Sequence, residues 1–152
     1  MDDLDVEILR FLQKNARASL SEIGQTVKLS VSAVGERVRK LEASGVISRY
    51  VAIIDGSFFH KELTAIMFIS LENPGYTESF VQFVKDENDV LECFYIAGNY
   101  DYVLKIVTNN PSTLEKLLNK IKSVPGIAKT YTNVVLASRK NNESVFPELQ
   151  FQ

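Results

Sequence analysis

Apolar residues recur at helical spacing in the first part of the chain. Leu4, Ile8 and Phe11 follow one another at intervals of four and three residues, so that one side of a helix is apolar. This pattern predicts a first helix over residues 3–13, with polar side chains on its other side. Asn15 and the residues after it break the pattern.

Two shorter helical segments follow. Ser19 and Glu22 have the spacing of a capping box, in which each side chain bonds the backbone amide of the other residue, and they predict the start of a second helix. Ser30 can cap a third helix over residues 31–43, and Gly45 stands where helices commonly end. Two short helices joined by a tight turn form a helix-turn-helix.

The rest of the chain alternates between apolar runs and amphipathic stretches. β-branched residues dominate 46–54, which predicts a strand that leaves the helical region. Further on we expect a strand over 63–71, a helix over 77–86, strands over 90–97 and 102–107, a helix opened by Pro111, and a last strand over 127–136. The order β-α-β-β-α-β indicates a ferredoxin-like sandwich, in which a four-stranded sheet carries two helices on one face.

The chain is therefore expected to be an α+β protein with two main parts. The predicted parts are a winged-helix-like helix-turn-helix domain over 1–50, a linker strand over 51–61, a ferredoxin-like domain over 62–140 and a tail over 141–152. The tail is polar at first and then apolar. It either stays free or docks Phe146, Leu149 and Phe151 on a neighbouring subunit.

The third predicted helix has different chemistry on its two sides. Val34, Val38 and Leu41 form an apolar back, whereas Arg39 and Lys40 stand on the opposite front. A helix that lies in the major groove of DNA needs this arrangement, because cations on its front reach guanine or phosphate. The alternative is a small amphipathic bundle with a solvated charged face. The candidate DNA-binding residues are Ser19, Ser21, Lys28, Ser30, Ser32, Ala33, Glu36, Arg37, Arg39 and Lys40.

Composition narrows the classes of protein that fit. Of the 152 residues, 45% are hydrophobic and 24% are charged, as in an ordinary globular protein. The net charge is −2, but residues 1–50 hold eight basic and seven acidic side chains. DNA binding would therefore depend on a few placed charges, multiplied by oligomerisation.

Residues that build other kinds of site are scarce. Cys93 and His60 are the single cysteine and the single histidine, which argues against an internal disulfide and against a zinc site. No apolar run approaches the ~20 residues that span a bilayer, and the N-terminus is acidic, unlike a secretory signal. We expect a cytoplasmic protein with no resident cofactor, no metal and no membrane partner.

Two sets of motifs carry a resemblance to a known family. LDVEILRFLQKNARASLSEIG, with LSVSAVGERVRKLEASGVISRYVA soon after it, closely resembles the N-terminal half of the Lrp/AsnC family of bacterial and archaeal transcription regulators. The Gly-x-Tyr-Asp-Tyr hairpin at Gly98–Tyr102 and the ending at Pro125–Thr132 are similar to the ligand-sensing domain of that family. The resemblance covers residues 2–138, and it is specific because independent motifs occur in the right order.

The chain departs from this family in the turn of the helix-turn-helix. The family commonly has glycine where Lys28 stands. A non-glycine residue at positive φ costs about 1 kcal/mol, so this turn is either strained or differently shaped. Whether Lys28 also contacts a phosphate is left open by the sequence.

The resemblance implies an effector site between dimers, usually for an amino acid. From the residues alone, Asp101 either caps backbone amides or binds a cation, and Asn99 is of a type common in turns. The chemistry suits an amino acid, because a carboxylate attracts an α-ammonium, while amides and hydroxyls bind an α-carboxylate. The effector-binding residues carried over from the family are Gly98, Asn99, Tyr100 and Asp101, with Thr130 and Thr132 from an adjoining subunit.

The sequence therefore predicts a sequence-specific DNA-binding transcription regulator of the Lrp/AsnC type, and not an enzyme. Its expected partners are double-stranded DNA, a free amino acid as effector, and copies of itself in a homodimer that assembles into an octamer or a similar ring. One alternative is a protein that compacts DNA with little sequence preference, which competition with unrelated DNA would reveal. Another is a small ferredoxin-like enzyme, in which Asp101 and Tyr100 would transfer a proton.

Overall fold

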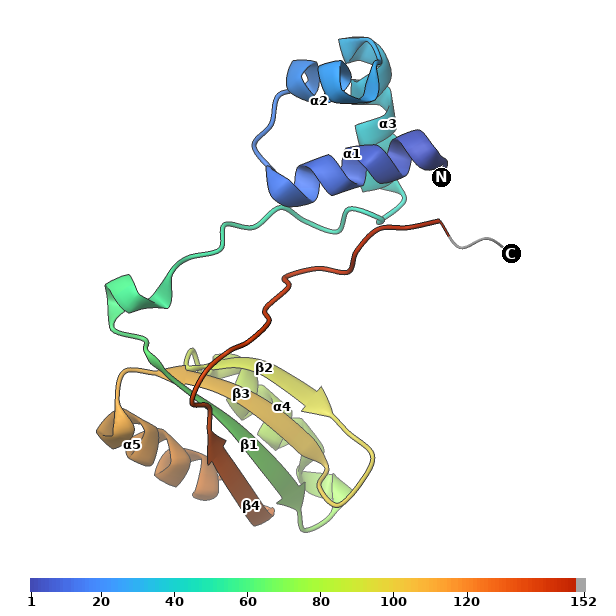
Figure 1. Cartoon of the computed structure of the whole chain (residues 1–152). Helices are drawn as coiled ribbons and strands as arrows, with labels where there is room; N and C mark the ends of the chain where they lie inside the picture. Colours follow the sequence, from blue (N-terminus) through green and yellow to red (C-terminus); the bar gives the residue numbers. More distant parts are fainter. Residues whose placement is uncertain (150–152) are drawn as a thin grey trace. The chain divides into compact units, whose positions relative to one another are not determined.

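The computed structural model describes residues 1–149, which divide into two compact units (Figure 1). We call Met1–Ile53, together with the residues from Lys140 onward, the helical unit, and Ile54–Arg139 the sheet unit. The helical unit contains a helix-turn-helix, and the sheet unit contains helices packed on a β-sheet. The predicted α+β fold is therefore confirmed.

Three helices build the helical unit: α1 (Asp3–Lys14), α2 (Leu20–Val27) and α3 (Val31–Ala43). Asp2 caps α1, because its carboxylate accepts a hydrogen bond of 3.0 Å from the amide of Asp5. The predicted capping box of Ser19 and Glu22 opens α2, and Ser30 caps α3. Local side-chain chemistry thus sets where each helix begins.

The three helices enclose a small apolar core. Ile8 of α1, Ile23 of α2 and Val34 of α3 are at most 1% exposed. A glycine in α2 allows the turn to fold back closely, since a Cβ at Gly24 would lie 2.7 Å from the carbonyl oxygen of Leu29. The backbone of the turn therefore lies against this glycine, where a side chain would not fit.

The turn between α2 and α3 is built on a lysine in a conformation that favours glycine. Lys28 has φ 56° and ψ 43°, in the left-handed region. The next amide, that of Leu29, donates a hydrogen bond of 3.0 Å to the carbonyl of Gly24 and closes the end of α2. Because a Cβ disfavours this region, the strained turn that the sequence left open is the one observed.

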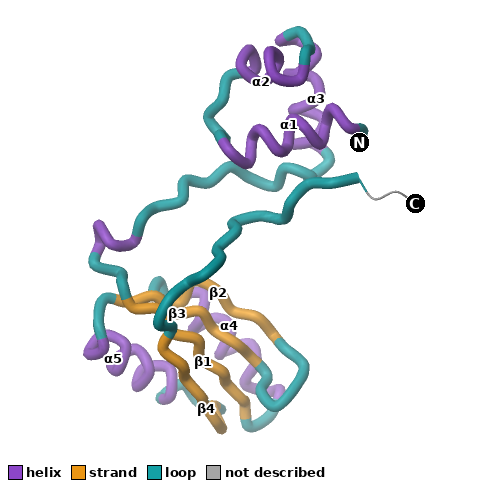
Figure 2. The backbone as a smooth tube through the Cα atoms, in the orientation of Figure 1, coloured by secondary structure: helices purple, strands orange, loops and turns teal. Residues whose placement is uncertain are grey.

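The sheet unit has the predicted order β-α-β-β-α-β. Its elements are β1 (Leu63–Leu71), α4 (Thr77–Asp86), β2 (Val90–Tyr95), β3 (Tyr102–Thr108), α5 (Pro111–Lys122) and β4 (Ile127–Val134), with short 3-10 helices η1 (Gly56–Phe59) and η2 (Pro74–Tyr76). Neighbouring strands are antiparallel in the order β2-β3-β1-β4 (Figure 2). This is the ferredoxin-like arrangement.

One face of this sheet carries the core. Met67 and Ile69 of β1 and Leu104 of β3 are fully buried. They pack with Phe80 of α4 and Leu117 of α5 in one hydrophobic cluster. Both helices therefore cover the same face of the sheet, as predicted. Within residues 1–149, the other face has no hydrophobic core with a helix.

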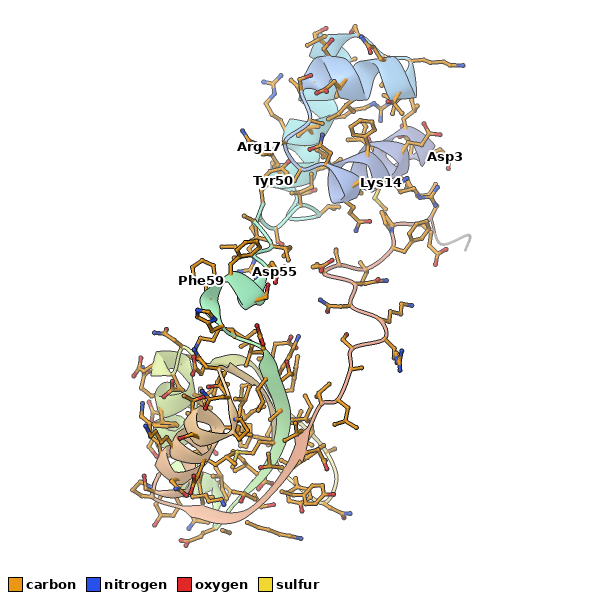
Figure 3. All side chains as sticks on the ribbon, turned by 60° about the vertical axis from the view of Figure 1, so that its left-hand side comes forward. Asp3, Lys14, Arg17, Tyr50, Asp55 and Phe59 are labelled. Carbon is orange, nitrogen blue, oxygen red and sulfur yellow. The ribbon has the colours of Figure 1, made fainter. Side chains whose placement is uncertain are left out.

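The segment between α3 and η1 differs from the prediction. The sequence predicts a strand over 46–54 and a linker strand over 51–61, but the described chain forms coil and η1 there. An extended segment needs a neighbouring strand to bond its backbone groups, and a single chain offers none at this place. Its apolar side chains stay exposed: Ile54 is 67% exposed, and Figure 3 shows Tyr50 and Phe59 along this segment.

The C-terminal tail belongs to the helical unit. The guanidinium of Arg10 in α1 lies over the ring of Phe146, 4.7 Å from its centroid. In the single chain the described tail is therefore not free, because it contacts helix α1, and docking on a neighbouring subunit stays a prediction. Leu149 is half-buried, and Phe151 lies outside the described residues.

All helices are short compared with the thickness of a bilayer. The longest, α3, has 13 residues, whereas a spanning helix needs about 20. Within residues 1–149, no helix has the length and apolar character required to cross a membrane.

Replacing Lys28 with glycine should stabilise the helical unit by about 1 kcal/mol, because glycine adopts the left-handed region without a Cβ clash. The change in the free energy of unfolding is measured by urea denaturation, in which hydrogen exchange of the α2 and α3 amides reports on the helical unit. Lys28→Ala removes the same charge but keeps the clash, so its stability should stay close to that of the wild type. Equal stabilisation by alanine and by glycine would contradict the conformational explanation.

Candidate nucleic-acid interface and effector loop

Helix α3 presents a charged front because its back is fixed in the core. Val34, Val38 and Leu41 are 0%, 9% and 5% exposed and pack against α1 and α2. Arg39 and Lys40 lie on the other side and are exposed. A helix held by its apolar back, with cations on its front, has the geometry of a helix that reads DNA.

The two cations on this front are available to a polyanion. The ammonium of Lys40 lies 3.0 Å from the carboxylate of Glu36, and the two side chains are 75% and 63% exposed. This hydrogen bond lowers the pKa of Glu36. Such an exposed pair contributes only about 0–1 kcal/mol, so a phosphate can replace Glu36. Arg39 donates from Nε to the carbonyl of Gly35 at 3.2 Å and stays exposed.

The small residues at the start of α3 do not all face the same way. Ser32 is exposed, and its hydroxyl lies 3.1 Å from that of Ser30. Ala33 is half-buried. A Cβ at Gly35 would lie 3.1 Å from Cδ1 of Leu20. Gly35 therefore lets α2 pack on α3, and Ser32 is the small residue that stands on the exposed front.

Arg37 faces α1 and is already paired. One guanidinium nitrogen lies 2.9 Å from the carboxylate of Asp2 and 2.7 Å from that of Asp5. The pKa of Asp2 is lowered, first by the Asp5 amide that it accepts and then by Arg37. The pKa of Arg37 is raised by its hydrogen bonds to the two carboxylates. Of the ten candidates, Arg37 is thus the one that joins α3 to the start of α1.

The remaining candidates lie on α2 and in the turn. Ser19, Ser21, Lys28 and Ser30 are all exposed. The hydroxyl of Ser19 accepts from the amide of Glu22 at 3.2 Å, and that of Ser30 accepts from the amide of Ala33 at the same distance. These two hydroxyls cap helices, whereas the side chains of Ser21, in the first turn of α2, and Lys28, in the turn that follows α2, take no part in capping.

The candidate effector loop joins β2 to β3. Gly98 has φ 149°, and nothing lies within 4 Å of the position of a Cβ there. The carboxylate of Asp101 accepts a hydrogen bond of 2.8 Å from the amide of Leu71, and its own amide donates to Ile69 at 2.9 Å. Asp101 therefore caps a backbone amide, one of the two roles that the sequence left open.

An aromatic cluster lies beside this loop. The ring of Tyr100 is 5.6 Å from that of Phe68 on β1, and Phe68 is 6.3 Å from Tyr131 on β4. The ammonium of Lys129 lies over Tyr100, 4.9 Å from the ring centroid. The loop thus brings an aromatic face, a cation and the Asp101 carboxylate into one region.

The two threonines lie elsewhere in a single chain. Thr130 pairs with Ile69 and Thr132 with Met67, so both threonines are on the face of the sheet that the helices cover. Tyr131, between them, points to the open face with Phe68. One chain therefore does not bring the threonines together with Tyr100, and the six candidate effector residues form no common site within it.

Two contacts were not found by sequence reasoning. The ion pairs of Arg37 with Asp2 and Asp5 join residues more than thirty positions apart. The two acids have the spacing of a capping box at the start of α1, which is a signal that the sequence does contain. The contact of Phe146 with Arg10 has no comparable local signal.

The two units together define a class of protein. The helical unit is a helix-turn-helix whose second helix exposes cations over a buried back, and the sheet unit is an α+β domain with one open sheet face. This combination is that of a two-domain helix-turn-helix regulator.

Comparisons with known proteins identify the family. The model of the AsnC-type helix-turn-helix domain matches residues 1–42, and that of the Lrp/AsnC ligand binding domain matches residues 64–145. The chain belongs to the Lrp/AsnC family of DNA-binding transcriptional regulators, as its motifs predict.

Individual relatives cover nearly the whole chain. It is 35% identical over 140 residues to the HTH-type transcriptional regulator FL11 of Pyrococcus abyssi, and the aligned region covers 92% of each chain. It is 34% identical over 146 residues to the leucine-responsive regulatory protein of Escherichia coli, with 93% of this chain and 88% of that protein covered. The structure of a Neisseria meningitidis transcriptional regulator in complex with L-Met matches with TM-score 0.91 and 27% identity, over 95% of this chain and 96% of that one.

Proposed function

We propose that this protein is a sequence-specific transcriptional regulator whose helix α3 enters the major groove of DNA. The observation that carries the proposal is the exposure of Arg39 and Lys40 over a back fixed by Val34 and Val38. Cations that project from a rigidly held helix meet bases and phosphates at the same register each time. Ser32 near the start of the helix allows the backbone to come close to base edges.

The regulator acts as a homodimer formed through the open face of the sheet. Phe94, Val103, Phe68 and Tyr131 pair in sequence across β2, β3, β1 and β4, so they form one apolar row over the whole sheet. Phe94 and Tyr131 are each 54% exposed. A second copy related by a two-fold axis would cover this row with the same row.

Dimerisation offsets the weak charge of each helical unit. Two linked units bind a two-part site much more tightly than one, because the second binding event becomes intramolecular. A two-fold dimer also presents its α3 helices to half-sites of a palindromic operator. Further assembly of dimers into an octamer or a similar ring would multiply this effect.

The effector is a free amino acid bound where dimers meet. The Asp101 carboxylate uses one oxygen for the Leu71 amide, and its other oxygen suits an α-ammonium. Gly98 and Asn99 are exposed and offer backbone amides to an α-carboxylate. Thr130 and Thr132 of an adjoining subunit would supply hydroxyls. The complex of the Neisseria meningitidis regulator with L-Met supports this class of ligand.

Regulation follows from a difference in effector affinity between two assembly states. The effector loop lies in the sheet unit, whereas the DNA face lies in the helical unit. An effector that binds one assembly better than another shifts the population toward it, and the spacing of the α3 helices changes with the assembly.

The combined substitution Arg39→Ala and Lys40→Ala should weaken binding to an operator by tenfold or more, since a base contact contributes about 1–3 kcal/mol. Electrophoretic retardation of a duplex selected by the wild-type protein from a random library measures this. The slope of log affinity against log salt should fall by roughly 0.9 per lost phosphate contact. Lys116→Ala with Lys122→Ala in α5 removes the same charge from the sheet unit and should leave binding unchanged. Unchanged binding by the α3 variant would exclude this face.

Phe94→Asp should convert the dimer into a monomer, because it places a charge in the apolar row of the sheet. Size exclusion with light scattering at micromolar concentration measures the mass. Leu136→Asp is the matched control, since Leu136 is 97% exposed and lies outside the sheet. A monomeric wild-type protein, or a Phe94→Asp variant that remains dimeric, would refute the proposed interface.

One or more of the twenty amino acids should raise the thermal stability of the wild-type protein, by about 2.7 kcal/mol at a hundredfold excess over Kd. Asp101→Asn keeps an acceptor for the Leu71 amide but removes the charge, so it should fold normally and lose the response. Glu78→Gln, an exposed position in α4, should keep it. An Asp101→Asn protein that responds like the wild type would remove Asp101 from the effector site.

A further inference from the structure

Helix α1 has buried residues on two sides, and the core formed with α2 and α3 accounts for the burial on one of them only. Ile8 belongs to the core cluster with α2 and α3. Val6 is 4% exposed but is not part of that cluster. With Arg10 and Gln13 it forms a stripe at positions i, i+4 and i+7. This stripe, which we call the outer face of α1, points away from Ile8, so another segment must cover it.

The C-terminal tail contacts this outer face through its backbone. The side-chain amide of Gln13 donates a hydrogen bond of 2.6 Å to the carbonyl of Val145. Nε of Arg10 donates one of 3.1 Å to the carbonyl of Pro147. The ring of Phe146, between these two carbonyls, lies under the Arg10 guanidinium. Figure 1 shows the tail passing beside α1.

The chemistry of both partners suits this contact. Proline fixes its own φ and keeps the preceding residue extended, so Phe146 and Pro147 lose little conformational freedom on docking. A guanidinium can donate from its edge while its flat face covers an aromatic ring, which an ammonium cannot do. Arg10 uses both properties at once, and Lys14, the next cation of α1, is exposed.

We propose that the outer face of α1 is a binding site for the chain's own Val145–Leu149, and that this segment acts as a releasable strap on the helical unit. Covalent chain links the units once between Ile53 and Ile54 and again between Arg139 and Lys140. The docked strap attaches the chain beyond the second link to α1 through Arg10 and Gln13. Phe146 remains 68% exposed while docked, so the contact is shallow and reversible.

The strap begins close to the last strand of the sheet unit. Ten residues separate the end of β4 at Val134 from Val145, so the strap is tethered to β4 by a short stretch of chain. β4 also carries Thr130 and Thr132. If these threonines bind an effector, as the proposed function requires, then docking of the strap is a route by which β4 influences the helical unit. The docking itself does not depend on DNA or effector binding.

Crosslinking of the full-length chain tests the docking. In a Cys93→Ala background, Gln13→Cys and Val145→Cys place two thiols at the contact, and a short bismaleimide joins them. We expect an internal crosslink, seen as a faster-migrating monomer on a denaturing gel and assigned by peptide mass. Adding Arg10→Lys and Phe146→Ala should lower its yield severalfold. Adding Lys14→Ala and Glu148→Ala, which change exposed neighbours, should not.

Three results would overturn the strap. They are the absence of a crosslink, a crosslink that joins two chains, and a yield that Arg10→Lys with Phe146→Ala does not change. Hydrogen exchange of the α1 amides gives a second measurement, and exchange should become faster in the Phe146→Ala protein but not in the Glu148→Ala protein. Both readouts are made without DNA and without effector, so they stand apart from the tests of the proposed function.

Discussion

Burial of the apolar back of α3 is the interaction on which the DNA face depends. Val34, Val38 and Leu41 pack against Ile8 and Ile23 in a core of only six buried residues. Each buried aliphatic side chain contributes about 1.5–3 kcal/mol, so a single weakened contact is a large part of this small core. The ion pairs of Arg37 with the start of α1 add a polar restraint at the same interface. The cations on the front are only as well placed as this packing allows.

The sheet unit separates its tasks by the two faces of one sheet. The covered face packs against α4 and α5 in one hydrophobic core, whereas the open face carries an apolar row that ends in Phe94 and Tyr131. Because successive residues of a strand point to opposite faces, the residues that would form the dimer interface are not those that form the core. Asp101, in contrast, combines two tasks, since its carboxylate fixes the loop and is also the candidate ligand for an effector.

Sequence reasoning succeeded where a pattern is local. Helical spacing located the back of α3, the Ser19 capping box located the start of α2, and the strand order gave the ferredoxin-like sheet. It failed over 46–54, because β-branched residues form a strand only when a neighbour is present. It also missed the pairing of Arg37 and the contact of Phe146, which join residues far apart in the chain. The faces of Thr130 and Thr132 needed the observed register of β4.

The helical unit is discontinuous in sequence, and this has a consequence for synthesis on the ribosome. Its three helices are made first, whereas the residues that contact the outer face of α1 are made last, after the entire sheet unit. At about 5–20 residues per second, the nascent helices wait on the order of ten seconds before the tail can contact Arg10 and Gln13. During that interval a chaperone or another nascent chain has access to the side of α1 that the tail contacts in the finished protein.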